Sequence, residues 1–198
     1  MQFVKSAIQS VFGTDANISS IRGKNRGKNK MYDYVLQYGF DIESENNIQN
    51  IKKCLKNNNI KDKERKWRPH ITIDLYDCTN QNEFIEKVDS IVNNIKCFEL
   101  ECKNLNDFDK ETLYIEPYNK DRLLELKLDF DNVLNDYRKL NRKERIYKPH
   151  ITLCTNENIN QSLYDLTHNV FEPFVAKVEK IWIYNQNMEL IKEYKLKN

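Results

Sequence analysis

The sequence predicts an α+β fold of two related lobes, each an antiparallel-type sheet with flanking helices. Strand-like and helix-like patterns alternate from residue 32 to the end, and no linker rich in Pro, Gly or Ser interrupts them. An eleven-residue block also occurs twice: residues 63–73, KERKWRPHITI, return 80 positions later as residues 143–153, KERIYKPHITL, with seven identical positions. The duplication predicts pseudo-two-fold symmetry with a central cleft between the lobes.

The first half of this region predicts two strands and two helices. Residues 32–40 are typical of a strand, an amphipathic helix follows, and residues 70–76 form the strand that ends the first repeat block. Asn80, with Glu83 three positions on, indicates the start of the second helix. The apolar positions at helical spacing are Ile48, Ile51 and Leu55 in the first helix, and Phe84, Val88, Ile91 and Ile95 in the second.

The second half repeats the order of strand, helix and His-bearing strand. Residues 98–105 and 113–115 predict two strands, and residues 123–137 predict a long amphipathic helix. The second repeat block supplies the strand at residues 150–155. The predicted closing elements are a short helix over residues 163–170 and a hairpin of residues 174–184 and 190–196 around Asn185-Gln186-Asn187.

Residues 1–30 stand apart as an N-terminal extension, and residues 31–198 are expected to form a single bilobal domain. The extension predicts a helix that ends near Gly13, followed by a basic loop at residues 23–30. The loop fails the P-loop pattern because its glycines are too close and Asn29 replaces the required Ser or Thr. It is either a solvated loop or one that reaches a phosphate.

Composition excludes several classes of partner. A net charge of +2 and a pI near 8.1 do not indicate a duplex-DNA-binding surface, although a small anion or a nucleic-acid end remains open. The chain has no secretory signal and no apolar run of about 18 residues, so we expect no membrane association. Its five cysteines form no CxxC pair. We expect a cytoplasmic protein with reduced thiols, as a monomer.

The phase of the repeat block places its polar residues on one face of each strand. Because side chains alternate along a strand, His70 and Thr72 point to one face and the flanking isoleucines to the other. His150 and Thr152 repeat this arrangement. If the lobes pack about a pseudo-two-fold axis, the two polar faces meet, and we expect both histidines on neighbouring strands, converging on one cleft.

Two imidazoles that flank one ligand suit acid–base catalysis. With an ordinary pKa of about 6.5, one ring accepts a proton while the other donates one. The threonine hydroxyls, and further Arg68 and Lys148, are candidates to hold phosphate oxygens. Trp67 and Tyr147, each three residues before its histidine, are candidates to stack on a base.

A structural reading stands beside the catalytic one. A single His-x-Thr on a strand is usually a packing feature, but two copies in register, each after a proline, favour function.

Two histidines without matched carboxylates or cysteines make a poor metal cage, so we expect no metal. His168 is expected on the surface. Arg65 and Arg145 either rim the cleft or pair with the neighbouring Glu64 and Glu144.

The paired Pro-His-Ile-Thr-aliphatic blocks resemble the two signature motifs of the 2H phosphoesterase superfamily, and the resemblance covers residues 31–198. It implies metal-independent phosphodiester chemistry without a cofactor. His70 and His150 would be acid and base, and Thr72 and Thr152 phosphate binders. The expected substrate is a nucleotide or RNA end, foremost a 2′,3′-cyclic phosphate. The alternatives are 2′-5′-linked or cyclic oligonucleotides, or a non-catalytic RNA- or nucleotide-binding module.

Overall fold

The computed structural model describes residues 32–60, 67–138, 140–156 and 158–198, so the predicted helix and basic loop of residues 1–30 lie outside the described residues. The elements follow in the order β1 (Tyr34–Phe40), α1 (Ile42–Asn57), β2 (His70–Tyr76), α2 (Gln81–Val92), β3 (Phe98–Phe108), β4 (Thr112–Pro117), α3 (Asp121–Leu134), the 3-10 helix η1 (Asn135–Tyr137), α4 (Leu140–Lys143), β5 (Ile151–Thr155), α5 (Gln161–His168), β6 (Phe174–Asn185) and β7 (Leu190–Lys195).

The described strands form one seven-stranded sheet in which every pair is antiparallel. The order is β2-β1-β6-β3-β4-β5, and β7 also pairs with β6. This confirms the predicted α+β class with antiparallel strands. The two halves share the β6–β3 pair, so they are joined into one continuous sheet. In this order the strands of the two repeat blocks, β2 and β5, occupy the two edges.

The long strand β6 joins the halves because its two ends pair differently. Its first residues, Phe174 to Val178, pair with β3, whereas Lys180 to Tyr184 pair with β7. On its other edge β6 pairs with β1 from Val178 onward. One strand therefore runs through both halves and holds them in a fixed relation.

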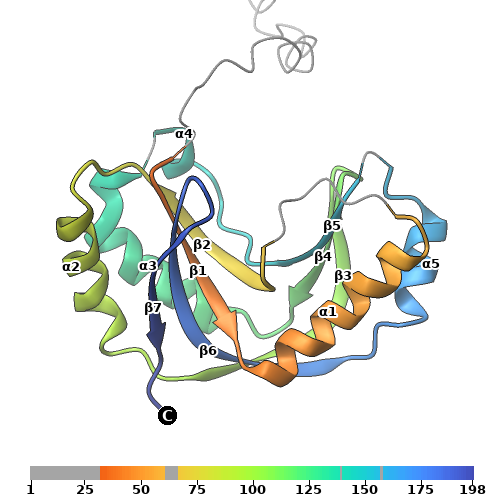
Figure 1. Cartoon of the computed structure of the whole chain (residues 1–198). Helices are drawn as coiled ribbons and strands as arrows, with labels where there is room; N and C mark the ends of the chain where they lie inside the picture. The colour runs from red at the N-terminus through yellow and green to blue at the C-terminus, as the bar shows by residue number, and fades with distance from the viewer. Residues whose placement is uncertain (1–31, 61–66, 139, 157) are drawn as a thin grey trace, which may run out of the picture. The chain divides into compact units, whose positions relative to one another are not determined.

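Each half of the sheet is packed by a helix from the other half of the chain. Helix α1 follows β1 but packs against β5 and α5, and Lys52 on α1 donates to the Thr152 carbonyl at 3.4 Å. Helix α3 follows β4 but packs beside α2, and Lys127 on α3 pairs with Asp74 on β2 at 3.2 Å. Figure 1 shows α2 and α3 on one side and α1 and α5 on the other. Because α1 and α3 each pack on the opposite half, one lysine lies near each His-bearing strand.

Local signals account for most element boundaries. Asn80 caps α2 by accepting from the Glu83 amide at 3.3 Å, as predicted, and the hairpin closes with the Asn185 amide donating to the Glu189 carbonyl. Helix α4 was not predicted because its four residues are too few to show a period. Among the described helices, none combines the length and the apolar character needed to cross a membrane.

Candidate active site

The strands β2 and β5 present their polar residues as the alternation predicts. Ile71 and Ile73 on β2 are buried, at 0% and 2% exposure, while His70 and Thr72, which alternate with them, are partly exposed. On β5, Ile151 and Leu153 are buried in the same way and Thr152 is partly exposed. The core therefore takes the aliphatic face of each strand and leaves the His-x-Thr face open.

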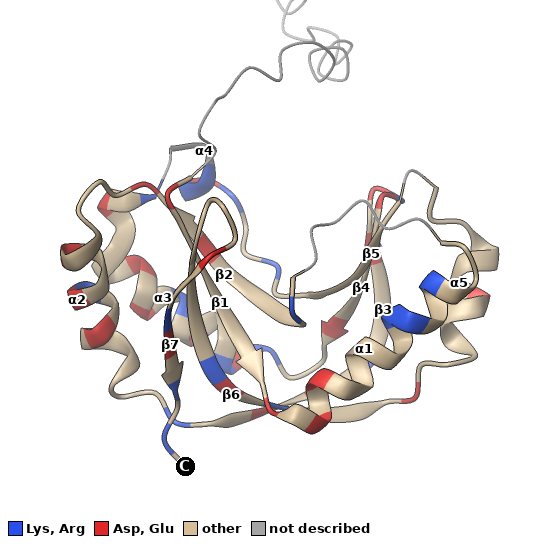
Figure 2. Ribbon diagram, viewed as in Figure 1, with Lys and Arg blue, Asp and Glu red and all other residues tan. Residues whose placement is uncertain are grey.

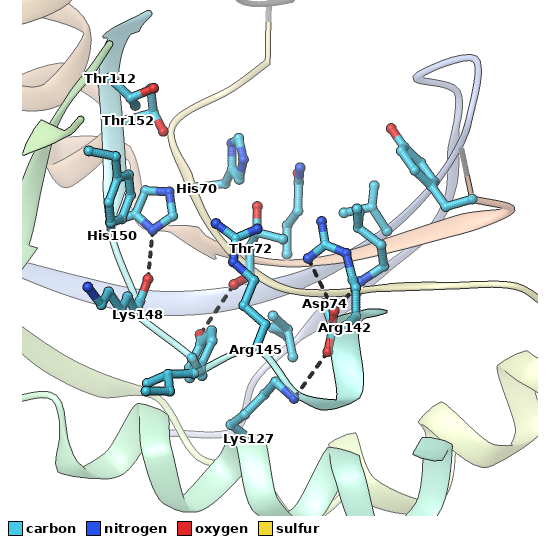
Figure 3. A pocket seen from close by; sticks show the side chains of 18 of the residues that line it. His70, Thr72, Asp74, Thr112, Lys127, Arg142, Arg145, Lys148, His150 and Thr152 are labelled. Carbon is cyan, nitrogen blue, oxygen red and sulfur yellow. Dashed lines mark hydrogen bonds and ion pairs between the residues drawn. The ribbon is translucent and has the colours of Figure 1, made fainter. Parts of the chain in front are cut away.

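The two polar faces line one pocket of about 700 Å³. His70, Thr72, His150 and Thr152 all border it, and Figure 3 shows His70 and Thr72 next to His150 and Thr152. The prediction that the histidines converge is confirmed, but their strands are neighbours in space only and are not hydrogen-bonded partners. β2 and β5 stand at the two ends of the strand order and pass close to each other without a shared backbone ladder.

Each imidazole is held by a hydrogen bond to a backbone carbonyl, and the two bonds are equivalent in the repeat. His70 Nδ1 lies 2.7 Å from the Arg68 carbonyl oxygen, and His150 Nδ1 lies 2.7 Å from the Lys148 carbonyl oxygen. A carbonyl only accepts, so Nδ1 carries the hydrogen in each ring. In the neutral form, Nε2 is then the basic atom of both histidines. The carbonyl two residues upstream thus selects the same tautomer twice.

Both histidines are neutral at neutral pH in the unliganded protein. Burial lowers the pKa of His70 to about 4, against the hydrogen bond to Arg68; the charge of Lys52, and repulsion from His150 whenever that ring is protonated, add to the lowering. Burial also lowers the pKa of His150, against the hydrogen bond to Lys148, and Arg145 adds to it. A bound anion acts in the opposite direction and favours the imidazolium form of either ring.

The two aromatic residues of the repeat block have different environments. Trp67 lines the pocket edge-on to His70, with ring centroids 5.9 Å apart, and also contacts Tyr184. Tyr147 lines the pocket too, but its hydroxyl donates to the Thr72 carbonyl at 3.2 Å. Burial raises the pKa of this phenol well above its usual value. Trp67 borders the open volume, whereas Tyr147 ties the second block to β2.

The two basic residues of the repeat block also differ. Lys148 lines the pocket, but Arg68 is not among the residues that border it. The Arg68 guanidinium lies 2.7 and 3.0 Å from the two carboxylate oxygens of buried Glu45 and stacks over Trp182 at 4.4 Å. The structure therefore brings Lys148 to the candidate site and holds the Arg68 side chain outside it.

A model of the 2′-5′ RNA ligase superfamily matches residues 40–188. The chain belongs to this superfamily. The predicted membership of the 2H phosphoesterases, which act on nucleotide and RNA phosphodiesters, is confirmed. The chain has no significant sequence match among curated proteins.

Several solved structures share the fold of this protein. One is LigT of E. coli complexed with 3′-AMP, with a TM-score of 0.60, 10% identity, and coverage of 84% of this chain and 99% of LigT. Another is TT0787 of Thermus thermophilus, with a TM-score of 0.62, 10% identity, and coverage of 84% of this chain and 98% of TT0787. At this identity the likeness concerns the fold alone.

The sequence motifs did not indicate several charged residues that lie in this pocket or next to it. Lys52 reaches Thr152 and lowers the pKa of His70, yet on an amphipathic helix it is one lysine among several. A charged group at the far end of the pocket, Asp74, Lys127, Arg138 and Arg142, was also missed. Asp74 continues the alternation of His70 and Thr72 along β2, so the strand pattern could have indicated it, whereas the three cations come from α3 and the segment through α4 and have no such signal.

The remaining candidates are placed as follows. Arg145 lines the pocket, Arg65 lies outside the described residues, and His168 is exposed at the end of α5, stacked on Tyr164. Within the described part of the chain, no three His, Cys, Asp or Glu side chains are grouped to hold a metal ion. No disulfide joins any of the five cysteines, all of which lie in the described part of the chain.

Proposed function

We propose that this protein is a metal-independent phosphodiesterase that hydrolyses 2′,3′-cyclic phosphates of nucleosides or RNA ends. The observation that carries the proposal is the pair of histidines, each with Nδ1 bonded to its own strand's upstream carbonyl and each beside a threonine in one pocket. Two equivalent proton-transfer groups on one volume suit a reaction that needs a base and an acid together.

In this mechanism the phosphodiester anion lies between the histidines. The Nε2 of one neutral ring takes a proton from water as the water oxygen attacks phosphorus. The other ring, protonated, gives its Nε2 proton to the ribose oxygen as the phosphorus–oxygen bond of the cyclic ester breaks. The product is a ribose phosphomonoester, and proton exchange with solvent restores both rings.

Substrate binding itself raises the pKa of one ring, which then takes up from solvent the proton that the acid needs. Both histidines are neutral without ligand, so an unliganded protein at neutral pH has a base but no acid. A phosphate anion beside the rings stabilises one imidazolium by charge attraction. The Thr72 and Thr152 hydroxyls donate to the non-bridging oxygens, and the second ring remains neutral as the base.

Two further features support a nucleotide substrate. Trp67 borders the pocket next to His70 and offers a face on which a base can stack. The E. coli structure of the same fold holds 3′-AMP, a ribose phosphomonoester of the kind this reaction releases. A non-catalytic binding module would need only the threonines and cations, whereas here both histidines line the pocket in matched tautomers.

The experiment is a substrate panel assayed with and without EDTA. The panel contains 2′,3′-cyclic AMP, a 2′-5′ dinucleotide and a cyclic dinucleotide, tested on the native protein and on His70→Ala and His150→Ala. We expect EDTA-resistant hydrolysis of the cyclic mononucleotide that both variants lose. Faster turnover of either other substrate would favour the alternative substrate class. No turnover of any of them, with binding retained, would establish the binding module instead.

A further inference from the structure

Positive side chains crowd one pocket of a nearly neutral protein. Five cationic residues line it, namely Lys127, Arg138, Arg142, Arg145 and Lys148, against two carboxylates, Asp74 and Asp109. This is an excess of three positive charges, whereas the whole chain carries a net charge of only +2. Figure 2 shows positive residues on α4 and on the segment that leads from it to β5. The charge is therefore concentrated here.

Two of these cations are already neutralised. Lys127 Nζ lies 3.2 Å from Asp74 Oδ2 and also contacts Asp131, while Arg138 Nε lies 2.7 Å from Asp74 Oδ2 and its Nη1 3.1 Å from Asp131 Oδ1. These four side chains form a balanced, largely buried group. They provide a rigid base for the pocket but no free positive charge.

Among the described residues, Arg142 and Arg145 have little counter-charge. Arg142 makes one long contact, 3.5 Å, with Asp74, a carboxylate that Lys127 and Arg138 already share, and Arg145 forms no ion pair with a described residue. Burial lowers the pKa of Arg142, against the attraction of Asp74, and repulsion from Arg145 and Arg138 adds to the lowering. An anion between the two guanidinium groups would relieve this repulsion.

These arginines lie within reach of a ligand bound at the histidines. In Figure 3 the Arg145 side chain extends toward Thr72, with Asp74 and Arg142 on the side away from His150. The positive charge of Arg145 also lowers the pKa of His150, so it acts over the same volume. A guanidinium binds phosphate through two parallel hydrogen bonds, which makes arginine suited to this anion.

We propose that Arg142 and Arg145 form a second anion subsite, which binds a further phosphate group of the substrate. This inference rests on the proposed function, because it takes the cleaved phosphodiester as the first anion. The preferred substrate is then a nucleotide with two phosphates, and the second is either the 5′-phosphate of a mononucleotide or the internucleotide phosphate of an RNA end. The pocket volume of about 700 Å³ accommodates such a ligand.

The test compares matched substrates on the native protein. Adenosine 2′,3′-cyclic phosphate is compared with its 5′-phosphorylated form and with the ApA dinucleotide that ends in a 2′,3′-cyclic phosphate. We expect kcat/KM to be higher for at least one of the two-phosphate substrates by about tenfold or more, the effect of one charge-assisted hydrogen bond. A gain with the 5′-phosphate identifies a mononucleotide site, and a gain with ApA alone identifies an RNA site.

Variants assign the gain to the two arginines. Arg145→Gln, alone and with Arg142→Gln, should abolish the preference, measured for each variant as the ratio of kcat/KM for the two-phosphate substrate to kcat/KM for the simple cyclic nucleotide. Arg145→Gln is informative by itself because it breaks no described ion pair, whereas Arg142→Gln also loses its contact with Asp74. Arg122→Gln on α3, whose partner is Glu125, is the matched control and should keep the preference.

A binding measurement separates this inference from the proposed function. Calorimetric affinities for adenosine 2′,5′-bisphosphate, adenosine 2′-phosphate and the ApA dinucleotide with a 2′-phosphate end need no turnover. Tighter binding of either two-phosphate ligand than of adenosine 2′-phosphate, lost in the Arg145→Gln variant, supports the subsite even if no cyclic phosphate is hydrolysed. Equal affinities and equal kcat/KM values across the series would overturn the subsite while leaving the phosphodiesterase proposal intact.

Discussion

The hydroxyl of Tyr147 donates to the backbone carbonyl of Thr72 at 3.2 Å, which joins the second repeat block directly to the strand that carries the first. These two edge strands share no backbone hydrogen bonds within the described sheet, so this contact helps to hold one polar face opposite the other. Tyr147 is therefore a positioning residue for the two histidines.

Replacing Tyr147 with Phe should loosen this arrangement. The loss of one part-buried hydrogen bond should lower the free energy of unfolding by about 0.5–1.5 kcal/mol, measured by urea denaturation. We also expect a fall in kcat of less than about tenfold, because the histidines remain but their spacing is less fixed. Tyr118→Phe, at a residue 65% exposed, is the control and should change neither quantity.

The histidines should act as a unit. His70→Ala and His150→Ala should each reduce kcat by at least about a hundredfold, since each removes one proton-transfer group. The double variant should be little worse than either single one. Thr72→Ala and Thr152→Ala should cost less, and His168→Ala should cost nothing. A single histidine variant with near-native kcat would refute the paired acid–base mechanism.

Stability should fall as the pH is lowered through the range from about 6.5 to about 4. Burial holds the pKa of His70 at about 4, below the ordinary value of about 6.5 expected in the unfolded chain. In this range the unfolded chain binds more protons than the folded protein, so the free energy of unfolding rises with pH. Urea denaturation at several pH values in this range gives the free energy of unfolding as a function of pH. This free energy should change less with pH for His70→Asn than for the native protein, while His168→Asn should behave like the native protein.

Arg68 should matter for stability and not for substrate affinity. Arg68→Ala removes the ion pair with buried Glu45 and the stacking on Trp182, but it keeps the backbone carbonyl that orients His70. We expect a lower free energy of unfolding, because Glu45 loses its close partner and keeps only the 3.7 Å contact with Lys180. KM should stay within about twofold. A large rise in KM without loss of stability would show instead that Arg68 contacts substrate.

Gly39 has to remain a glycine for a steric reason. A Cβ at this position would lie 2.5 Å from the ring of Trp182, which is fully buried against it. Gly39→Ala should therefore lower the free energy of unfolding by about 1–3 kcal/mol or more. In a protein that already carries Trp182→Phe, Gly39→Ala should lower the free energy of unfolding by less than it does in the native protein. The smaller ring of phenylalanine leaves room for the methyl group.

The sequence by itself determined the elements and the chemistry-bearing residues. Alternation within each repeat block is local, so it placed His70 and Thr72 on one face and the isoleucines on the other without knowledge of the fold. Helical periods and the Asn80 cap are equally local, and they located the strands and principal helices to within a few residues. The duplication then indicated that both histidines serve one site.

Only the tertiary structure decided how these pieces meet. The position of β2 and β5 at opposite edges, the exchange of α1 and α3 between halves, and the cation cluster around Asp74 all depend on long-range pairing. Arg68 and Lys148 occupy equivalent positions in the repeat, yet buried Glu45 holds one side chain outside the pocket while the other lines it. Local patterns dictate which way a side chain points from its strand, but its electrostatic partner comes from distant segments that only folding brings near.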